Sequence, residues 1–275
     1  MNQPIPTKEQ LAVLNQSERR AYRIAHFMTR YLKWLGIAWN LVFMRFLIWF
    51  CVGRRVEFIG TENLKDITSK SRLMLVANHR SFFDFFSIAY WFLISWNVPR
   101  KMYFPVRANF FYESFLGIIV TAMMGSWAMF PPIFRDPKKR TFNRYAIERV
   151  IYEFRKSPSL IGFHPEGKRN KDKDPYSFLE ARAGIGHVML EVEDAVVIPL
   201  FIYGLTNSFG TEIKRNWGGK RKDYPIHLMF GPPIDMERFR SMSDDANRSQ
   251  EIAEECMRAI RALGAEHKLK YNPDM

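Results

Sequence analysis

Beyond Arg54, short apolar runs alternate with longer stretches in which apolar residues recur at helical spacing. Short runs bounded by turn residues indicate buried strands, and longer periodic stretches indicate helices. The predicted strands are Val56–Ile59, Leu73–Ala77, Met102–Val106, Ala128–Phe134, Leu160–Phe163, Val196–Ile202 and Ile226–Phe230. The predicted helices are Asp84–Trp96, Phe111–Met124, Phe142–Lys156, Ala181–Val192 and Ala246–Leu263. This alternation favours an α/β domain over residues 54–275, with a mainly parallel sheet flanked by helices.

The N-terminal part has another pattern: residues 1–16 are a loose polar tail, and residues 17–53 are predicted to be helical. Polar side chains lie on one helical stripe, at steps of 3, 4, 3 and 7 residues: Arg23, His26, Arg30, Lys33 and Asn40. Apolar side chains lie largely off that stripe: Trp34, Leu35, Ala38, Trp39, Leu41 and Val42. Lys33 and Arg45 interrupt the apolar run, whereas a simple spanning helix has about 18 or more apolar residues in succession. We therefore expect an amphipathic, membrane-associating helical segment in the lipid interface; the alternative is a helix packed on the protein's own core.

A second apolar stretch, Ser114–Phe134, carries no charged residue. Pro131 and Pro132 break it as a helix, and Gly117 and Gly125 weaken it. We therefore expect a buried or surface-inserted helix that runs into a strand. The first dozen residues of the chain are polar, and no secretory signal pattern is visible.

The composition points to an anionic partner. The 275 residues carry a formal net charge of +13, and 15% of them are aromatic. Positive charge attracts nucleic acid, anionic lipid or phosphorylated substrates, and aromatic side chains gather at lipid interfaces. Basic residues are spread among many segments and no nucleic-acid-binding motif occurs, so a bilayer with anionic headgroups is the expected partner. The two cysteines are far apart, which favours a reducing compartment and the cytoplasmic face of the membrane.

Two loops are strongly charged, Lys168–Asp174 and Lys214–Lys222. Most such loops are solvated. The second loop holds Trp217 between basic clusters, a combination that suits a lipid headgroup region.

The most informative string is Leu75-Val-Ala-Asn-His-Arg-Ser-Phe-Phe-Asp84. In open α/β sheets ligands bind beyond the carboxyl ends of the strands, and His79 stands there, directly after an apolar strand. Asp84 follows five residues later, in the first turns of the next helix. Its carboxylate can bind one ring nitrogen of His79 and leave the other free to take a proton. A hydroxyl of the substrate would then be the nucleophile.

A second string, Leu160-Ile-Gly-Phe-His-Pro-Glu-Gly-Lys-Arg169, also passes from an apolar strand into a polar turn. Gly167 permits a close backbone approach to a ligand, and Lys168 and Arg169 supply positive charge suited to a phosphate. A third apolar strand carries Pro199, which predicts a break or an edge near the site.

Together these strings resemble the glycerolipid acyltransferase family, whose best-known members are the 1-acylglycerol-3-phosphate acyltransferases. Asn78, His79 and Asp84 match the family's first motif, and Val197-Ile-Pro-Leu200 matches the fourth. The third motif, Phe-Pro-Glu-Gly-Thr-Arg, resembles His164-Pro-Glu-Gly-Lys-Arg169, with His164 in place of its Phe and Lys168 in place of its Thr. The second motif fits Phe130–Arg135 only in outline, and the resemblance covers about Val56 to Leu205.

The resemblance implies an O-acyltransferase of phospholipid biosynthesis, with His79 and Asp84 catalytic and no metal or other cofactor. Acyl-CoA or acyl-carrier protein is the implied donor, and a lysophospholipid such as 1-acylglycerol-3-phosphate is the implied acceptor. The implied substrate-binding residues are Asn78, Arg135, Glu166, Gly167 and Arg169, with Arg140 or Arg144 as alternatives to Arg135. Backbone N–H groups at the start of the helix after His79 are expected to stabilise the oxyanion.

Neither cysteine lies in a motif and no Gly-x-Ser-x-Gly elbow occurs, which disfavours a covalent serine or cysteine route. Ser81 is expected to cap the helix that begins near Asp84. Family relatives acylate other lysolipids and glycolipids, and these remain alternative acceptors. Two rival classes are a metal-dependent hydrolase that uses His79, Asp84, His164 and Glu166, and a non-catalytic basic protein that binds membranes. Neither His–acid pair has the spacing of a common zinc motif.

Overall fold

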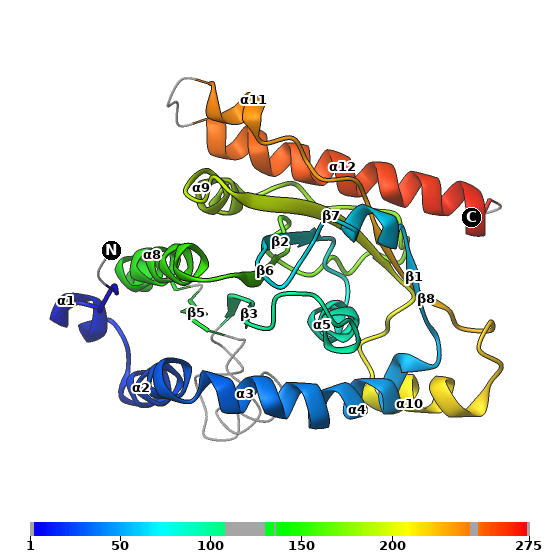
Figure 1. The fold of residues 1–275 in the computed structure, drawn as a ribbon, viewed down its shortest axis with the longest axis horizontal. Coiled ribbons are helices and arrows are strands. Elements are labelled where there is room, and N and C mark those ends of the chain that lie inside the picture. The colour runs from blue at the N-terminus through cyan, green and yellow to red at the C-terminus, as the bar shows by residue number, and fades with distance from the viewer. Residues whose placement is uncertain (1–2, 108–129, 135, 243–246, 274–275) are drawn as a thin grey trace.

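The structure is a computed structural model that describes residues 3–107, 130–134, 136–242 and 247–273. Its centre is a six-stranded sheet in the order β1-β8-β7-β2-β6-β3 (Figure 1). These strands are β1 (Val56–Ile59), β2 (Arg72–Ala77), β3 (Met102–Tyr103), β6 (Ser159–Phe163), β7 (Ala195–Tyr203) and β8 (Ile226–Phe230). All neighbours in this sheet pair in parallel except β7 and β8. The predicted α/β class with a mainly parallel sheet is therefore confirmed.

Helices cover both faces of the sheet (Figure 1). Those of the domain are η3 (Thr61–Leu64), α5 (Asp84–Ile94), η4 (Pro137–Lys139), α8 (Arg140–Lys156), α9 (Gly184–Leu190), α10 (Phe209–Gly218), α11 (Glu237–Arg240) and α12 (Arg248–Tyr271). Those of the N-terminal part are α1 (Lys8–Ala12), α2 (Gln16–Tyr31), α3 (Lys33–Trp39), η1 (Asn40–Met44), α4 (Arg45–Ile48) and η2 (Trp49–Gly53).

Strand β2 shows how the two faces are filled. Leu73, Leu75 and Ala77 join one buried cluster, with α5 and the N-terminal helices. Met74 and Val76 point to the other face and join a second cluster, with α8, α9 and α12. Since successive side chains of a strand alternate between faces, a strand buried on both sides reads as a continuous apolar run. This places β2 in the middle of the fold.

Some predicted elements differ from the observed ones. Pro105 lies between two short strands where one strand, Met102–Val106, was predicted: β3 joins the main sheet, and β4 (Val106–Arg107) pairs with β5 (Pro132–Ile133). The predicted helix Phe111–Met124 and most of Ser114–Phe134 lie outside the described residues. Helices α10 and α11 were not predicted. Helix α12 continues to Tyr271, beyond the predicted end, because buried His267 is hydrogen-bonded to the sheet.

Pro199 lies within β7, a central strand, so the predicted break or edge is wrong. Its carbonyl accepts a hydrogen bond from Gly231 N, at 2.9 Å. The N–H and C=O of one strand residue point to the same side, so the missing N–H of Pro199 faces the segment that follows β8. The ladder between β7 and β2 therefore loses no donor at this position.

The N-terminal tail is more ordered than predicted. Thr7 forms a capping box at the start of α1, and Asn15 forms a second one with Glu18 at the start of α2. Leu14, between the two helices, is buried against the domain. The tail thus contains a short helix and an apolar contact.

Residues 16–53, hereafter the N-terminal helical segment, form consecutive helices along one side of the domain (Figure 1). Apolar residues lie on two sides of the segment: Tyr22, Met44 and Ile48 are buried in the core, whereas Trp34 is 66% exposed and Val42 75% exposed. Of the predicted polar stripe, Asn40 is buried and Lys33 donates to the carbonyl of Met102. One apolar face therefore packs on the domain, and the segment exposes further large apolar side chains that a helix packed on a protein core in water does not need.

Among the described residues, Lys33–Gly53 is long and apolar enough to cross a membrane, by length and composition only. It has 21 residues, and the mean hydropathy of its most apolar part is 1.8. Lys33 and Arg45 therefore do not prevent the segment from meeting the hydropathy of a spanning helix. The same composition occurs in the core helices of soluble proteins, but only 33% of this stretch is buried.

Candidate active site

Three neighbouring strands end at the same edge of the sheet. β2 leads to His79, β6 leads to His164, and β7 leads through the turn at Gly204 to Asn207. Since these strands are parallel, their carboxyl ends lie side by side, which is where α/β sheets bind ligands. The topology therefore brings together the strings that the sequence predicted to carry the chemistry.

His79 and Asp84 are in direct contact. The Nδ1 of His79 lies 2.9 Å from Oδ2 of Asp84. The same carboxylate oxygen accepts hydrogen bonds from the backbone N–H groups of Arg80, at 2.8 Å, and Ser81, at 2.9 Å. The Asp84 side chain is 1% exposed and that of His79 is 24% exposed. The carboxylate thus holds the imidazole by Nδ1 and leaves Nε2 as the nitrogen that can exchange a proton.

Burial sets the protonation state of the pair. It raises the pKa of Asp84 to about 6, against the opposing effects of His164 and of the two backbone hydrogen bonds. Burial also lowers the pKa of His79 to about 4, and the positive charge of Arg169 adds to this lowering. At neutral pH the pair is therefore a carboxylate and a neutral imidazole, the form required of a general base.

Asn78 and Glu166 lie below the surface, and the backbone occupies their polar atoms. The amide of Asn78 donates to the carbonyl of Ile202 and accepts from its N–H. Glu166 accepts from the N–H groups of His79, at 2.7 Å, and Leu179, at 2.9 Å. Both side chains are buried. This geometry favours a role in positioning the backbone at His79 over the substrate contact expected from the sequence.

Gly167 and Arg169 are exposed at the same edge. Gly167 has a φ of 64°, a left-handed conformation that suits glycine. Arg169 donates to the side chain of Asn207, at 2.8 Å. Arg135 lies outside the described residues, and its alternatives Arg140 and Arg144 are exposed in the first turns of α8.

The expected oxyanion donors have other acceptors. The N–H groups of Arg80 and Ser81 bind Asp84, that of Phe82 binds Asn207, and that of Phe83 binds the Ser81 hydroxyl. These four amides are therefore not oxyanion donors in the geometry described, and a role for the first N–H groups of α5 itself stays a prediction. The four amides organise the turn between β2 and α5 instead.

Sequence reasoning missed three contributions to the site. His164 was considered only as a metal ligand and as a departure from a motif, yet its ring stacks on His79. Arg80 donates to the carbonyls of Ser177 and Asp172, and it thereby ties their loop to the turn after β2. Asn207 accepts from Phe82 and Arg169. Two of these residues could have been noticed in the sequence, because His164 replaces the Phe of the third motif and Arg80 is adjacent to His79. Asn207 lies beyond the end of a strand, where no motif marks it.

His79, Asp84 and His164 form the one group of three metal-binding side chains found among the described residues, with ligand atoms within 4.8 Å of one another. The lone pairs of an imidazole lie in its ring plane, so two ligand rings must aim their planes at one ion. The planes of His79 and His164 are instead nearly parallel, at 9°, and stacked. Nδ1 of His79 and Oδ2 of Asp84 are also paired with each other. This arrangement fits a base and its orienting acid better than a metal centre.

The candidate nucleophiles are enclosed. Cys51 and Cys256 are both buried free cysteines. Ser81 is buried, donates to the carbonyl of Thr206 and accepts from Phe83 N, in the turn ahead of α5. No side-chain cap is formed at Phe83, the residue that precedes α5, so the prediction that Ser81 caps this helix is wrong; the Ser81 hydroxyl accepts from Phe83 N within the preceding turn instead. The geometry favours a substrate hydroxyl as nucleophile.

Two apolar pockets lie along the seam between the N-terminal helical segment and α5. The larger is lined by residues that include Cys51, Phe83, Phe86, Ser87 and Phe209. Phe83, one of its lining residues, directly precedes Asp84 in the sequence. The Ser87 hydroxyl in its wall is buried, with no hydrogen-bond partner among the described residues.

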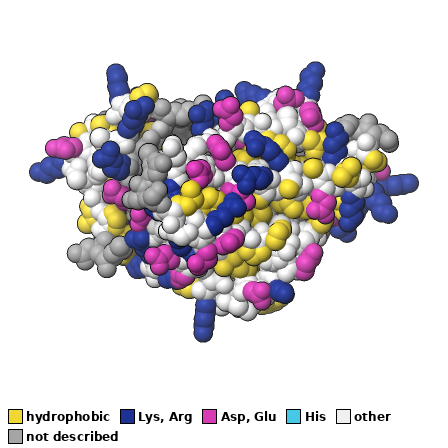
Figure 2. All heavy atoms as spheres, turned by 90° about the horizontal axis from the view of Figure 1, so that it is seen from above, with side chains coloured by type: hydrophobic (Ala, Val, Ile, Leu, Met, Phe, Trp, Pro, Cys, Tyr) yellow, Lys and Arg dark blue, Asp and Glu magenta, His cyan; other side chains and the backbone are white. Residues whose placement is uncertain are grey.

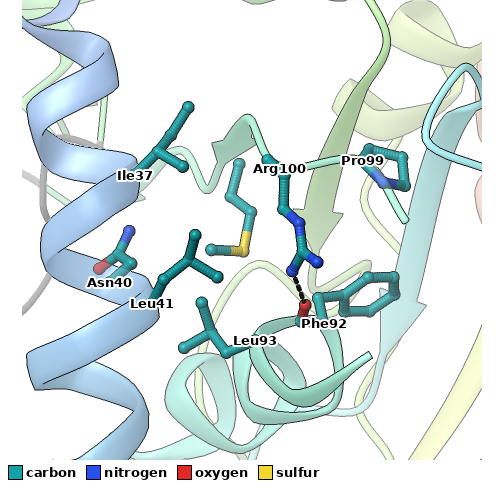
Figure 3. Close-up of a pocket in the computed structure, with 8 residues that line it drawn as sticks. Ile37, Asn40, Leu41, Phe92, Leu93, Pro99 and Arg100 are labelled. Atoms are coloured by element: carbon teal, nitrogen blue, oxygen red, sulfur yellow. Dashed lines mark hydrogen bonds between the residues drawn. The ribbon is translucent and has the colours of Figure 1, made fainter. Parts of the chain in front are cut away.

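The smaller pocket, which has no space for a water molecule, lies farther along the same seam (Figure 3). Ile37 and Leu41 face Leu93 across it, and Arg100 donates to the carbonyl of Phe92, at 2.9 Å. Side chains that are mostly apolar thus line the seam on both sides. Two π-helical turns, Asn40–Met44 and Trp49–Gly53, contribute residues to these pockets, and such turns are frequent at functional sites.

A mainly parallel α/β sheet in which His79 contacts buried Asp84 beyond the carboxyl end of a strand has the arrangement of an enzyme site where an imidazole can take a proton. The Acyltransferase family model matches residues 55–203, more than half of the chain and the whole region that carries the site. The protein therefore belongs to the acyltransferase family and has the domain of an acyltransferase. No curated protein gave a significant match.

Proposed function

We propose that this enzyme transfers a fatty acyl group from acyl-CoA or acyl-carrier protein to the hydroxyl of a lysophospholipid of the 1-acylglycerol-3-phosphate type, in phospholipid biosynthesis. The observation that carries the proposal is the contact of His79 with buried Asp84 at the end of β2. Other lysolipids and glycolipids are the alternative acceptors, and the acceptor panel below distinguishes them.

In the proposed mechanism, Nε2 of His79 takes the proton of the acceptor hydroxyl while the hydroxyl oxygen attacks the carbonyl carbon of the thioester. Asp84 holds the imidazole and stabilises the imidazolium that forms. The tetrahedral intermediate then collapses: the carbon–sulfur bond breaks, and the departing thiolate takes the proton from His79. An ester and a free thiol result, without an acyl-enzyme and without a cofactor.

The phosphate of the acceptor is proposed to bind at Arg169. This guanidinium is exposed at the same strand edge as His79 and lies close enough to lower the pKa of that imidazole. Gly167, two residues before it, leaves room for a close approach of the ligand. Arg135 is a further proposed phosphate ligand.

Replacing Arg169 with alanine is expected to raise the KM for 1-acylglycerol-3-phosphate about 10- to 100-fold, because a charge-assisted hydrogen bond to phosphate contributes about 1.5–3 kcal/mol. The KM for an uncharged monoacylglycerol should change little. A panel of both acceptors with labelled acyl-CoA measures this, and Arg258→Ala, on exposed α12, is the matched control. The phosphate assignment would be refuted if the wild-type enzyme preferred the uncharged acceptor. It would also be refuted if Arg169→Ala raised the KM equally for both acceptors.

The larger apolar pocket is proposed to hold a fatty acyl chain, because it is apolar and one of its lining residues, Phe83, directly precedes Asp84 in the sequence. Cys51→Phe should fill part of it and raise the KM for a sixteen-carbon acyl-CoA about tenfold, since each CH₂ left unburied costs about 0.8 kcal/mol. An eight-carbon donor should be affected much less. A chain-length series measures the change, with Cys51→Ser as the control of nearly equal volume. If the folded Cys51→Phe variant kept the wild-type chain-length preference, this pocket would be excluded as the binding site of the acyl chain.

The N-terminal helical segment is proposed to lie in a lipid interface at the cytoplasmic face of the membrane. Its outward face combines apolar and basic side chains, namely Phe27, Trp34, Val42, Phe46 and Trp49 with Arg20, Arg23, Arg30 and Arg45. Such a face gains from burial among acyl chains and from anionic headgroups. The opposite side of the molecule, on which α12 lies, shows acidic and basic side chains interspersed with hydrophobic ones (Figure 2).

The double variant Trp34→Glu/Val42→Glu is expected to lower partition into phosphatidylcholine–phosphatidylglycerol vesicles at least about tenfold, which corresponds to 1.4 kcal/mol. Vesicle co-sedimentation measures it. Leu269→Glu on α12 is the matched control, because Leu269 is 77% exposed and Val42 is 75% exposed. If the double variant sedimented with vesicles as the control does, membrane contact would have to be made elsewhere.

A further inference from the structure

The ring of His164 lies flat against the ring of His79. The two ring centroids are 4.0 Å apart, and the planes differ by 9°. His164 follows β6, and its Nδ1 donates to the carbonyl of Ala77, at 3.0 Å. Ala77 is the last residue of β2, the strand that leads directly to His79. His164 is therefore tied to the same piece of backbone that carries the imidazole on which it stacks.

Asp84 alone does not fix the orientation of His79. A hydrogen bond at Nδ1 sets the direction of that nitrogen, but it leaves the ring able to tilt about the line that joins Nδ1 and Oδ2. A flat ring in contact with one face opposes this tilt. Two contacts of different kinds thus define where Nε2 points, and the direction of Nε2 decides whether a hydroxyl can reach it in line.

The electrostatics of His164 suit such a support. Burial lowers the pKa of His164 to about 3, with a further contribution from His79, so its ring is neutral when His79 acts. A neutral aromatic face attracts a cation placed over it. The imidazolium that forms on His79 during proton transfer therefore meets a ring that stabilises it, whereas a charged neighbour would repel it.

We propose that His164 is a positioning residue for the catalytic imidazole: its ring, held by the Ala77 carbonyl, sets the plane of the His79 ring and so the direction of Nε2. This inference rests on the proposed acyl transfer with His79 as base. The ring face is the essential feature, and the hydrogen bond to Ala77 serves to hold that face in place.

Two substitutions separate the ring face from the hydrogen bond. His164→Phe keeps a flat ring and loses the donor to Ala77, whereas His164→Gln keeps an N–H donor and loses the ring. We expect the Gln variant to lose about 10- to 100-fold in kcat, the loss typical of a misplaced catalytic group, with KM changed less than about twofold. The Phe variant should stay within about threefold of the wild-type kcat. His187→Gln, an exposed histidine on α9, is the control.

A spectroscopic measurement reports on the stack directly. In protein with isotope-labelled histidine, the ring protons of His79 should be shifted upfield by the ring current of residue 164. This shift should persist in His164→Phe and disappear in His164→Gln. Thermal unfolding of each variant shows whether it is folded at the assay temperature.

The inference is overturned if folded His164→Gln keeps the wild-type kcat. It is also overturned if folded His164→Phe loses about tenfold or more in kcat, an outcome that can be measured even when the Gln variant does not fold. His79→Ala, assayed in parallel, separates this failure from failure of the proposed function. A fully active His79→Ala variant refutes the base itself, whereas an inactive one with active His164→Gln refutes only the role of His164.

Discussion

Replacing His79 with alanine is expected to lower kcat for acyl transfer by about 10³-fold, within the range of 10²- to 10⁴-fold that general-base catalysis contributes. The reason is that Nε2 of His79 is the proposed acceptor of the hydroxyl proton, and a free hydroxyl attacks a thioester poorly. KM values should change little, because the imidazole acts on the transition state rather than on binding. Initial rates with labelled acyl-CoA and saturating acceptor measure the effect.

The control for this variant is His187→Ala, since His187 is an exposed histidine on α9. It should keep wild-type rates. His79 is itself partly exposed, so its truncation should leave the thermal unfolding midpoint within a few degrees of wild type. A folded His79→Ala variant with wild-type kcat would contradict the catalytic role of His79, and the His–Asp pair would then have only a structural role.

Replacing Asp84 with asparagine is expected to lower kcat about 10²- to 10³-fold while the protein stays folded. Oδ1 of Asp84 is buried with no hydrogen-bond partner among the described residues, so the amide NH₂ can take that place. The amide oxygen can then accept the bonds that Oδ2 now accepts from His79, Arg80 and Ser81. What the variant loses is the negative charge that stabilises the imidazolium.

Asp84→Ala should be worse in two respects. It removes the charge and the hydrogen bonds together, so His79 loses its orientation as well as its counter-charge. It also leaves two buried backbone N–H groups unpaired, each at a cost of about 1–3 kcal/mol, and the unfolding temperature should fall. Kinetics and thermal unfolding of the two variants are measured side by side. If Asp84→Asn were as active as wild type, the negative charge would have no catalytic function.

The strand–helix pattern and the His79–Asp84 contact could be predicted because both are local. A strand, a tight turn and a helix start within ten residues leave few ways to arrange the two side chains, and the structure brings their atoms to 2.9 Å. Val56–Ile59 and Ile226–Phe230 were predicted to the residue for a similar reason: each is an apolar run bounded by turn residues.

The functions of Asn78 and Glu166 could not be predicted in the same way. Asn78 binds Ile202, 124 residues further along the chain, and Glu166 binds the backbone of His79, 87 residues away. A motif says which chemical groups are present, but the side to which each group turns depends on which strands become neighbours. The same holds for His164, whose stacking on His79 requires β6 to lie beside β2.

The sequence alone determined the class of this protein, because hydrophobic periodicity, a strand-end His–Asp pair and the order of short motifs are properties of nearby residues. Only the tertiary structure decided how far the pair is buried, which N–H groups are already occupied, and which face of the N-terminal helical segment is turned outward. These features arise from contacts between distant segments. The His79–Asp84 pair is thus encoded locally, whereas the orientation and protonation of that pair depend on the packing of the whole fold.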